Sequence, residues 1–140
     1  MFAQKKKVMM MRQAAPSGGT PVTGLRWEIG RNLNASGQNT SATYGACTYR
    51  IEAAGTQVKR TGLASYDNVA INMFIHEYSA DYSGLGTYAW IKRTQVFAGG
   101  EPLTLDSRTT YVAFTFAFGS SSGKTMTQAI IDAAFGAEWV

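Results

Sequence analysis

Apolar side chains recur at every second position through most of the chain after residue 24, which is the spacing of a half-buried β-strand. The clearest segment is Asn68–Ser79, in which four apolar side chains in succession share one face: Val69, Ile71, Met73 and Ile75. Further segments of this kind are Leu25–Arg31, Thr43–Glu52, Thr56–Leu63, Thr87–Ala98 and Ser107–Phe118. Between them, Asn32–Ser41 is expected to be a loop, and Asp81–Gly86 is expected to contain a hairpin turn. Short strands separated by polar, glycine-bearing turns predict an antiparallel meander or sandwich.

The end of the chain follows a different period. Gly119–Gly123 interrupts the last strand, and Lys124–Trp139 then repeats its apolar positions at helical spacing, with Thr125 placed to cap the helix. We therefore expect an α+β fold, an antiparallel sheet of about six strands followed by one C-terminal helix and completed by dimerisation. The helix has a narrow apolar stripe that is expected to pack in the dimer interface: Met126, Ile130 and Ala134.

Residues 1–24 are expected to form a basic N-terminal arm or linker ahead of a single domain at 25–140. The arm begins MFAQKKKVMMMR, and its apolar run is shorter than the core of a secretory signal. Gln13–Gly24 contains two prolines and three glycines, which favour an extended segment. The arm is predicted to lie on a partner, either another subunit or nucleic acid; the alternative is a frayed terminus without a role.

Composition and charge narrow the function classes. The chain has 140 residues and no apolar run long enough for a spanning helix, so one domain and no membrane partner are expected. One cysteine and one histidine argue against an internal disulfide and a Cys/His metal cluster, and no metal or cofactor is expected. Residues 1–60 hold nine Lys or Arg against two Glu, a net charge of +7, whereas residues 61–140 carry −3. This asymmetry favours a polyanionic partner, although solubility alone also explains it.

Candidate catalytic motifs are weak. Gly119–Thr125 (GSSSGKT) follows a strand and precedes a helix, but it has one residue too few between its glycines for a phosphate-binding loop and is expected to be a turn. His76 and Glu77 are neighbours on a strand and point to opposite faces, so they cannot act on one atom. Cys47 fits a small core residue. We expect no enzyme activity and no small-molecule substrate.

Polar and basic side chains interleave on the predicted strands. Thr48 and Arg50 share one strand face, and the turn at Ala53–Gly55 is expected to bring Lys59 onto the neighbouring strand. Asn72 and His76 form a similar row. Such a face can contact phosphates and unpaired bases, although an antiparallel sheet ordinarily has one solvated polar face. The predicted RNA-binding residues are Thr48, Arg50, Lys59, Asn72, His76 and Lys92.

Two segments resemble the coat proteins of single-stranded RNA bacteriophages. Arg108–Phe135 is similar to that family's last apolar strand, polar turn and amphipathic helix, and Ala46–Arg50 looks like its central strand. The resemblance implies that subunits pair edge to edge into a continuous sheet and that many such dimers assemble into an icosahedral shell around RNA. It also implies that the polar sheet face lines the shell interior.

These features lead to the expectation of a structural coat protein that packages RNA and resides in the virion, with itself and RNA as partners. Two other classes stay open. One is a stand-alone nucleic-acid-binding β-sheet module, and the other is a structural subunit of a phage tail or pilus. The size and nucleic-acid content of the purified protein separate the coat protein from the stand-alone module. A very large particle that carries nucleic acid indicates the coat protein, and a small species rich in nucleic acid indicates the module.

Overall fold

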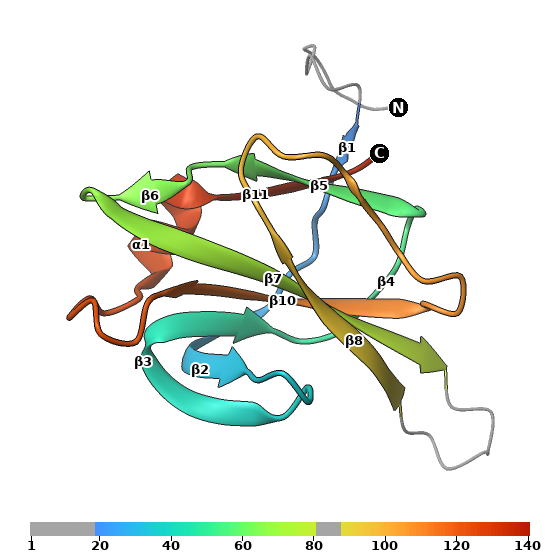
Figure 1. The fold of residues 1–140 in the computed structure, drawn as a ribbon, viewed down its shortest axis with the longest axis horizontal. Helices are drawn as coiled ribbons and strands as arrows, with labels where there is room; N and C mark the ends of the chain where they lie inside the picture. The colour runs from blue at the N-terminus through green and yellow to red at the C-terminus, as the bar shows by residue number, and fades with distance from the viewer. Residues whose placement is uncertain (1–18, 81–87) are drawn as a thin grey trace.

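Residues 19–80 and 88–140 are described in the computed structural model, and they fold into two antiparallel β-sheets (Figure 1). The seven-stranded sheet runs in the order β2, β3, β10, β7, β6, with β4 beside β10 and β8 beside β7. Its strands are β2 (Trp27–Leu33), β3 (Asn39–Thr48), β4 (Ile51–Glu52), β6 (Ser65–Tyr66), β7 (Val69–Ala80), β8 (Tyr88–Val96) and β10 (Tyr111–Phe118). The four-stranded sheet contains β1 (Thr20–Pro21), β11 (Phe135–Trp139), β5 (Gln57–Gly62) and β9 (Leu103–Thr104), in that order.

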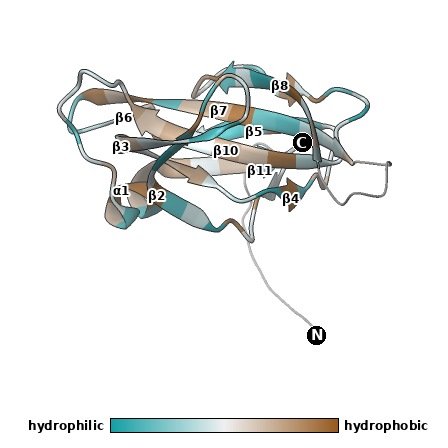
Figure 2. Ribbon diagram, turned by 90° about the horizontal axis from the view of Figure 1, so that it is seen from below, coloured by the Kyte–Doolittle hydropathy of each residue, from teal (hydrophilic) through white to brown (hydrophobic). Residues whose placement is uncertain are grey.

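The main core lies between the two sheets. Strand β10 contributes Val112, Phe114, Phe116 and Phe118, spaced by two, and all four side chains are buried. Val58 of β5 is buried in the same cluster from the four-stranded sheet. Each fully buried side chain of this size contributes roughly 2 kcal/mol through removal of apolar surface from water. Figure 2 shows β7 and β10 running through the middle of the molecule.

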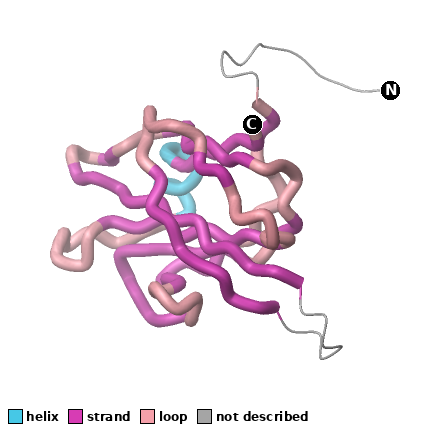
Figure 3. The backbone as a smooth tube through the Cα atoms, turned by 45° about the vertical axis from the view of Figure 1, so that its right-hand side comes forward, coloured by secondary structure: helices cyan, strands magenta, loops and turns pink. Residues whose placement is uncertain are grey.

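The alternation of apolar residues therefore predicts the main strands correctly. All six predicted segments contain a strand, and the expected mostly antiparallel sheet with a short helix near the C-terminus is found (Figure 3). Residues 32–41, expected to be a loop, instead form the ends of a hairpin, because β2 extends to Leu33 and β3 begins at Asn39. The turn expected at Asp81–Gly86 lies outside the described residues.

The helix is shorter than its sequence period predicts. Helix α1 covers Gln128–Ala134 only, and the hydroxyl of Thr127, not Thr125, caps it by accepting from the Ile130 amide. The next five residues leave the helix and form β11 between β1 and β5. Ladder hydrogen bonds with strands distant in sequence thus outweigh the local helical pattern.

The domain begins before residue 24. Thr20 and Pro21 pair with Trp139 and Glu138, and the Val22 amide donates to the Ala137 carbonyl. The end of the expected linker is therefore part of the four-stranded sheet. The basic side chains of the arm, at positions 5, 6, 7 and 12, lie outside the described residues.

A buried arginine joins the two sheets. Arg60 of β5 is 4% exposed, and its guanidinium donates to the carbonyls of Ile71 at 2.9 Å, Leu63 at 2.9 Å and Val96 at 3.3 Å. Burial lowers the pKa of Arg60 from its ordinary value. The planar group fastens β5 to β7 and to the end of β8.

Within the described ranges, no helix is long and apolar enough to span a membrane.

Candidate nucleic-acid interface

A cleft opens on the face of the seven-stranded sheet that points away from the main core. It has a volume of about 370 Å³, within the range of binding sites for small groups. Its walls come from β2, β3, the β3–β4 junction, β7 and β8. The lining residues are Glu28, Leu33, Gly37, Asn39, Thr48, Tyr49, Arg50, Tyr78, Tyr88 and Ala113.

The cleft exists because the β2–β3 hairpin curls back across the sheet (Figure 1). The hairpin turn reaches Trp90 on β8, where a Cβ on Gly37 would lie only 2.5 Å from an indole carbon. Gly37 also has a φ of +77°, which favours glycine. Beneath the turn, a second small core contains Leu33, Cys47, Tyr78 and Ala113, with Trp90 and Tyr111 packed against it.

Two arginine–tyrosine pairs lie at the cleft: Tyr49, Arg50 and Tyr88 line it, and Arg26 is next to it through its contact with Tyr49. The Arg26 guanidinium lies 4.3 Å from the centre of the Tyr49 ring, and the Arg50 guanidinium lies 4.1 Å from that of Tyr88. Arg50 is also 5.2 Å from the ring centre of Tyr78. Tyr49 and Tyr88 are 44% and 41% exposed, so each ring offers surface to a ligand. Cations held against aromatic rings are typical of surfaces that bind nucleic-acid strands.

The cleft residues at the β3–β4 junction owe their exposure to a break in the strand. Regular pairing ends at Thr48 and resumes at Ile51, so Tyr49 and Arg50 lie between two strands that both pair with β10. The Tyr49 amide donates to the Arg26 carbonyl across to β2. Both side chains are consequently exposed, whereas strict alternation would bury one of them.

A carboxylate held by hydrogen bonds lies within the same cleft. Glu28 Oε1 accepts from Asn39 Nδ2 at 2.6 Å, and Glu28 Oε2 accepts from the Tyr49 hydroxyl at 3.2 Å. Asn39 is oriented in turn by Arg31, whose Nε donates to Asn39 Oδ1 at 2.5 Å. This chain of contacts fixes the position of an acidic group in the cleft.

Two titratable groups are kept neutral: Tyr78, which lines the cleft, and Cys47, which lies in the same small core. Burial raises the pKa of the Tyr78 hydroxyl, an effect that Arg50 opposes, and the hydroxyl is buried without a hydrogen bond of ordinary geometry to the described residues. Burial also raises the pKa of Cys47 to about 11, with Glu28 acting in the same direction. A protonated, buried thiol is a poor nucleophile, so Cys47 acts as the small core residue expected from the sequence.

The structure separates several of the residues predicted to bind RNA. Arg50 is exposed at the cleft, but Thr48 is buried and its hydroxyl accepts from the Phe114 amide at 2.9 Å. Lys59 lies on β5 in the four-stranded sheet, because the chain crosses from one sheet to the other after β4. The expectation that Arg50 and Lys59 lie on neighbouring strands is therefore wrong.

The second predicted row is also not a solvated face. Asn72 is half-buried and accepts from Gln95 Nε2, whereas His76 is fully buried with its Nε2 2.8 Å from the Thr115 hydroxyl. Burial, together with the charge of Arg93, lowers the pKa of His76 to about 3. Trp90 covers this ring, at a centroid distance of 5.9 Å. His76 is thus unavailable to RNA, while Lys92 is exposed on β8.

The residues predicted for a dimer interface pack inside the chain itself. Met126 and Ala134 are 1% and 0% exposed and belong to the main core, and Ile130 packs against that core. Helix α1 contacts β6 and β11 of the same chain, and a second subunit is not needed to cover its apolar stripe. These three residues are therefore not a free surface.

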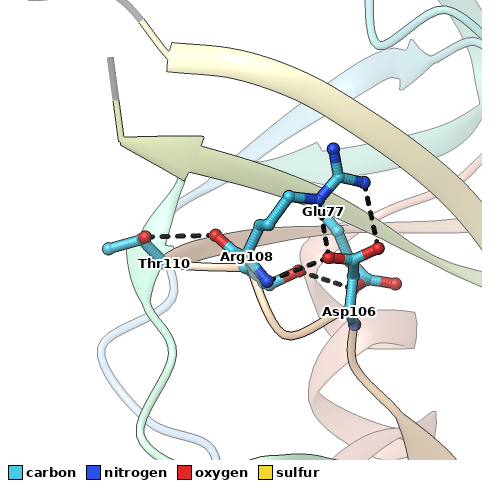
Figure 4. A network of polar contacts seen from close by, with 5 residues as sticks. Glu77, Asp106, Arg108 and Thr110 are labelled. Carbon is cyan, nitrogen blue, oxygen red and sulfur yellow. Dashed lines mark hydrogen bonds and ion pairs between the residues drawn. The ribbon is translucent and has the colours of Figure 1, made fainter. Parts of the chain in front are cut away.

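A second polar network lies away from the cleft and holds in place the loop that precedes β10 (Figure 4). Glu77 Oε1 accepts from the Asp106 amide at 2.7 Å and the Thr109 hydroxyl at 2.6 Å. The Arg108 side chain beside Asp106 holds the pKa of that carboxyl well below its usual range. Glu77 is fully buried and faces this loop, so its role is structural.

The glycine-rich segment before α1 is a turn, as its spacing predicts. The Ser122 amide donates to the Gly119 carbonyl, and Lys124 forms an ion pair with Asp67 at 3.7 Å. Within the described ranges, no group of three or more His, Cys, Asp or Glu side chains is arranged to hold a metal ion.

Sequence reasoning missed most of the cleft. Arg26, Glu28, Asn39, Tyr49 and Tyr88 come from three separated segments, and only the curl of the hairpin brings them together. The local signal that was available is the Tyr49-Arg50 pair at a strand break, since adjacent exposed aromatic and cationic residues often form binding surfaces.

Comparisons with known proteins identify no relative of this chain. No family model matches the chain, and no curated protein or solved structure matches it.

Proposed function

We propose that this protein binds single-stranded RNA in the cleft and does so as a structural coat protein. The observation that supports RNA binding is the pairing of Arg26 with Tyr49 and of Arg50 with Tyr88 around one cleft. Each pair combines a phosphate-binding cation with an aromatic ring on which an unpaired base can stack.

In this mode of RNA binding, the arginines and the tyrosines of the cleft contact different parts of the strand. The Arg26 and Arg50 guanidinium groups neutralise phosphates, and bases stack on the exposed surface of Tyr49 and Tyr88. Sequence-specific recognition of RNA mostly uses unpaired bases that stack on aromatic side chains, so a cleft with exposed tyrosines suits a single strand whose bases are splayed out. Arg26 and Arg50 also belong to the half of the chain with a net charge of +7.

The coat role is favoured by the open edges of the seven-stranded sheet. Among the described strands, β2 and β8 each pair on one side only. Such edges are templates for pairing with another copy. Phe97, the residue that follows β8, is 63% exposed and adds an apolar side chain near this edge. A stand-alone RNA-binding module is the second candidate, and the same cleft supports it equally.

The experiment that tests RNA binding compares Arg50→Ala with Lys59→Ala. Fluorescence anisotropy with a labelled single-stranded RNA is expected to show about tenfold weaker binding for Arg50→Ala. The slope of log affinity against log salt should fall by about 0.7, the value for one lost phosphate contact on a single strand. Lys59→Ala removes the same charge from the other sheet and should change neither quantity.

Arg50→Lys provides a further control, because it keeps the charge and loses the planar stacking group. It is expected to restore the salt slope but not the full affinity. Equal losses for Arg50→Ala and Lys59→Ala would contradict the proposal, since they would show that only overall charge matters.

A further inference from the structure

We propose that the cleft selects guanine among the bases of the RNA strand, an inference that rests on the proposed RNA binding. The observation behind it is Glu28, a carboxylate in a site that is otherwise arranged for an anion. A carboxylate repels phosphate, so its presence calls for a ligand group that donates hydrogen bonds. The base edges of the strand are the donors available there.

Glu28 is held in place and still has acceptor capacity. A carboxylate has about four lone-pair sites, two on each oxygen. Asn39 occupies one site on Oε1, and the Tyr49 hydroxyl occupies one on Oε2. One site on each oxygen is therefore left for a ligand with two adjacent donors, and the contact of Arg31 with Asn39 keeps the group oriented.

Guanine is the base whose pairing edge fits this acceptor pair. Its N1–H and N2–H groups are adjacent donors, whereas adenine, cytosine and uracil each place an acceptor beside their donor. An acceptor of the base would face a carboxylate oxygen and be repelled.

The test uses uracil-only RNA of about eight nucleotides, a length within the range of one binding site, with a single central base replaced. Binding to the wild-type protein is expected to be about tenfold tighter with guanine than with adenine, cytosine or uracil at that position. Inosine keeps N1–H and lacks the 2-amino group, so it should fall between guanine and the others. Equal affinities for all five oligonucleotides would overturn the guanine assignment and leave RNA binding intact, whereas no binding by any of them would overturn the proposed function itself.

The variant Glu28→Gln tests the carboxylate directly, because an amide replaces one acceptor by a donor. It should abolish the preference for guanine while the uracil-only strand binds as tightly as before or more tightly. Tyr49→Phe keeps the ring and removes one hydrogen bond to Glu28, so a smaller loss of preference is expected. A guanine preference that survives in Glu28→Gln would contradict the assignment.

Free nucleotides distinguish a base within RNA from a soluble ligand. Guanosine monophosphate should displace the guanine-containing strand at lower concentration than uridine monophosphate does, and equal displacement would contradict the assignment. Guanosine monophosphate that binds more tightly than the strand would overturn the RNA assignment in favour of a free nucleotide.

Discussion

His76 illustrates how a single buried residue sets the response of this fold to acid. The imidazole is fully buried, contacts the Thr115 hydroxyl and lies against Trp90, and its pKa is lowered to about 3. The charged group that faces it is Arg93, opposite on β8. The folded protein therefore keeps the ring neutral at pH values where the unfolded chain, with an ordinary pKa near 6.5, takes up a proton.

This difference predicts acid destabilisation. A depressed pKa contributes stability that is present above the unfolded value and is lost as the pH falls from about 6.5 towards 3. Urea denaturation should show a free energy of unfolding about 2 kcal/mol lower at pH 5 than at pH 8. In His76→Gln, which keeps a polar partner for Thr115 and does not titrate, most of that difference should disappear. The same loss in both proteins would assign the acid response to other groups.

At the scale of elements, the decisive feature is the hairpin turn that lies on Trp90. The β2–β3 turn contacts the indole through Gly37, and this contact closes the cleft and covers the second small core. The sheet would otherwise be open on that side. The proposed RNA-binding geometry therefore depends on the hairpin curl as much as on the arginines and tyrosines.

Gly37→Ala is expected to disturb both stability and binding. The added methyl meets the Trp90 ring at a distance that no real Cβ adopts, and the residue has a positive φ. Gly99→Ala is a matched control, because Gly99 has a similar φ of +75° and open space around its Cα. Thermal or urea unfolding should show a loss of about 1 kcal/mol for the control and roughly 2–3 kcal/mol for Gly37→Ala. RNA affinity should fall only in Gly37→Ala, and equal behaviour of the two variants would contradict the role of the turn.

At the scale of elements, the sequence predicts the strands that have a local pattern and misses the features that depend on pairing between distant segments. Period-two segments such as Asn68–Ser79 predict their strands because alternation is a local signal. Strand β11 escapes prediction, since its apolar residues also fit a helix and only pairing with β5 decides between them. His76 was expected on a solvated face, but the curled hairpin and Trp90 cover that face, and no local pattern in the sequence encodes such a curl. For the same reason, Thr48 and Arg50 are the only residues predicted to bind RNA that line the cleft.

At the scale of the whole molecule, the open strand edges and the charge asymmetry favour assembly around a polyanion. The proposed coat role predicts a large particle with bound nucleic acid. Gel filtration with light scattering, together with the ratio of absorbance at 260 and 280 nm, checks this directly. A small species rich in nucleic acid would instead support the stand-alone module, and a small species free of nucleic acid would count against both.

The central claim is that RNA lies against the tyrosine rings of the cleft, and ultraviolet crosslinking with mass spectrometry of the modified peptides tests it most directly. Adducts are expected on Tyr49 and Tyr88 in either a monomer or a particle. Phe97 is an internal control, because it is more exposed than either tyrosine and lies outside the cleft lining. Crosslinks concentrated on Tyr49 and Tyr88, and reduced in Arg50→Ala, are the predicted result. Crosslinks that favour Phe97, or that are absent from both tyrosines, would contradict the account.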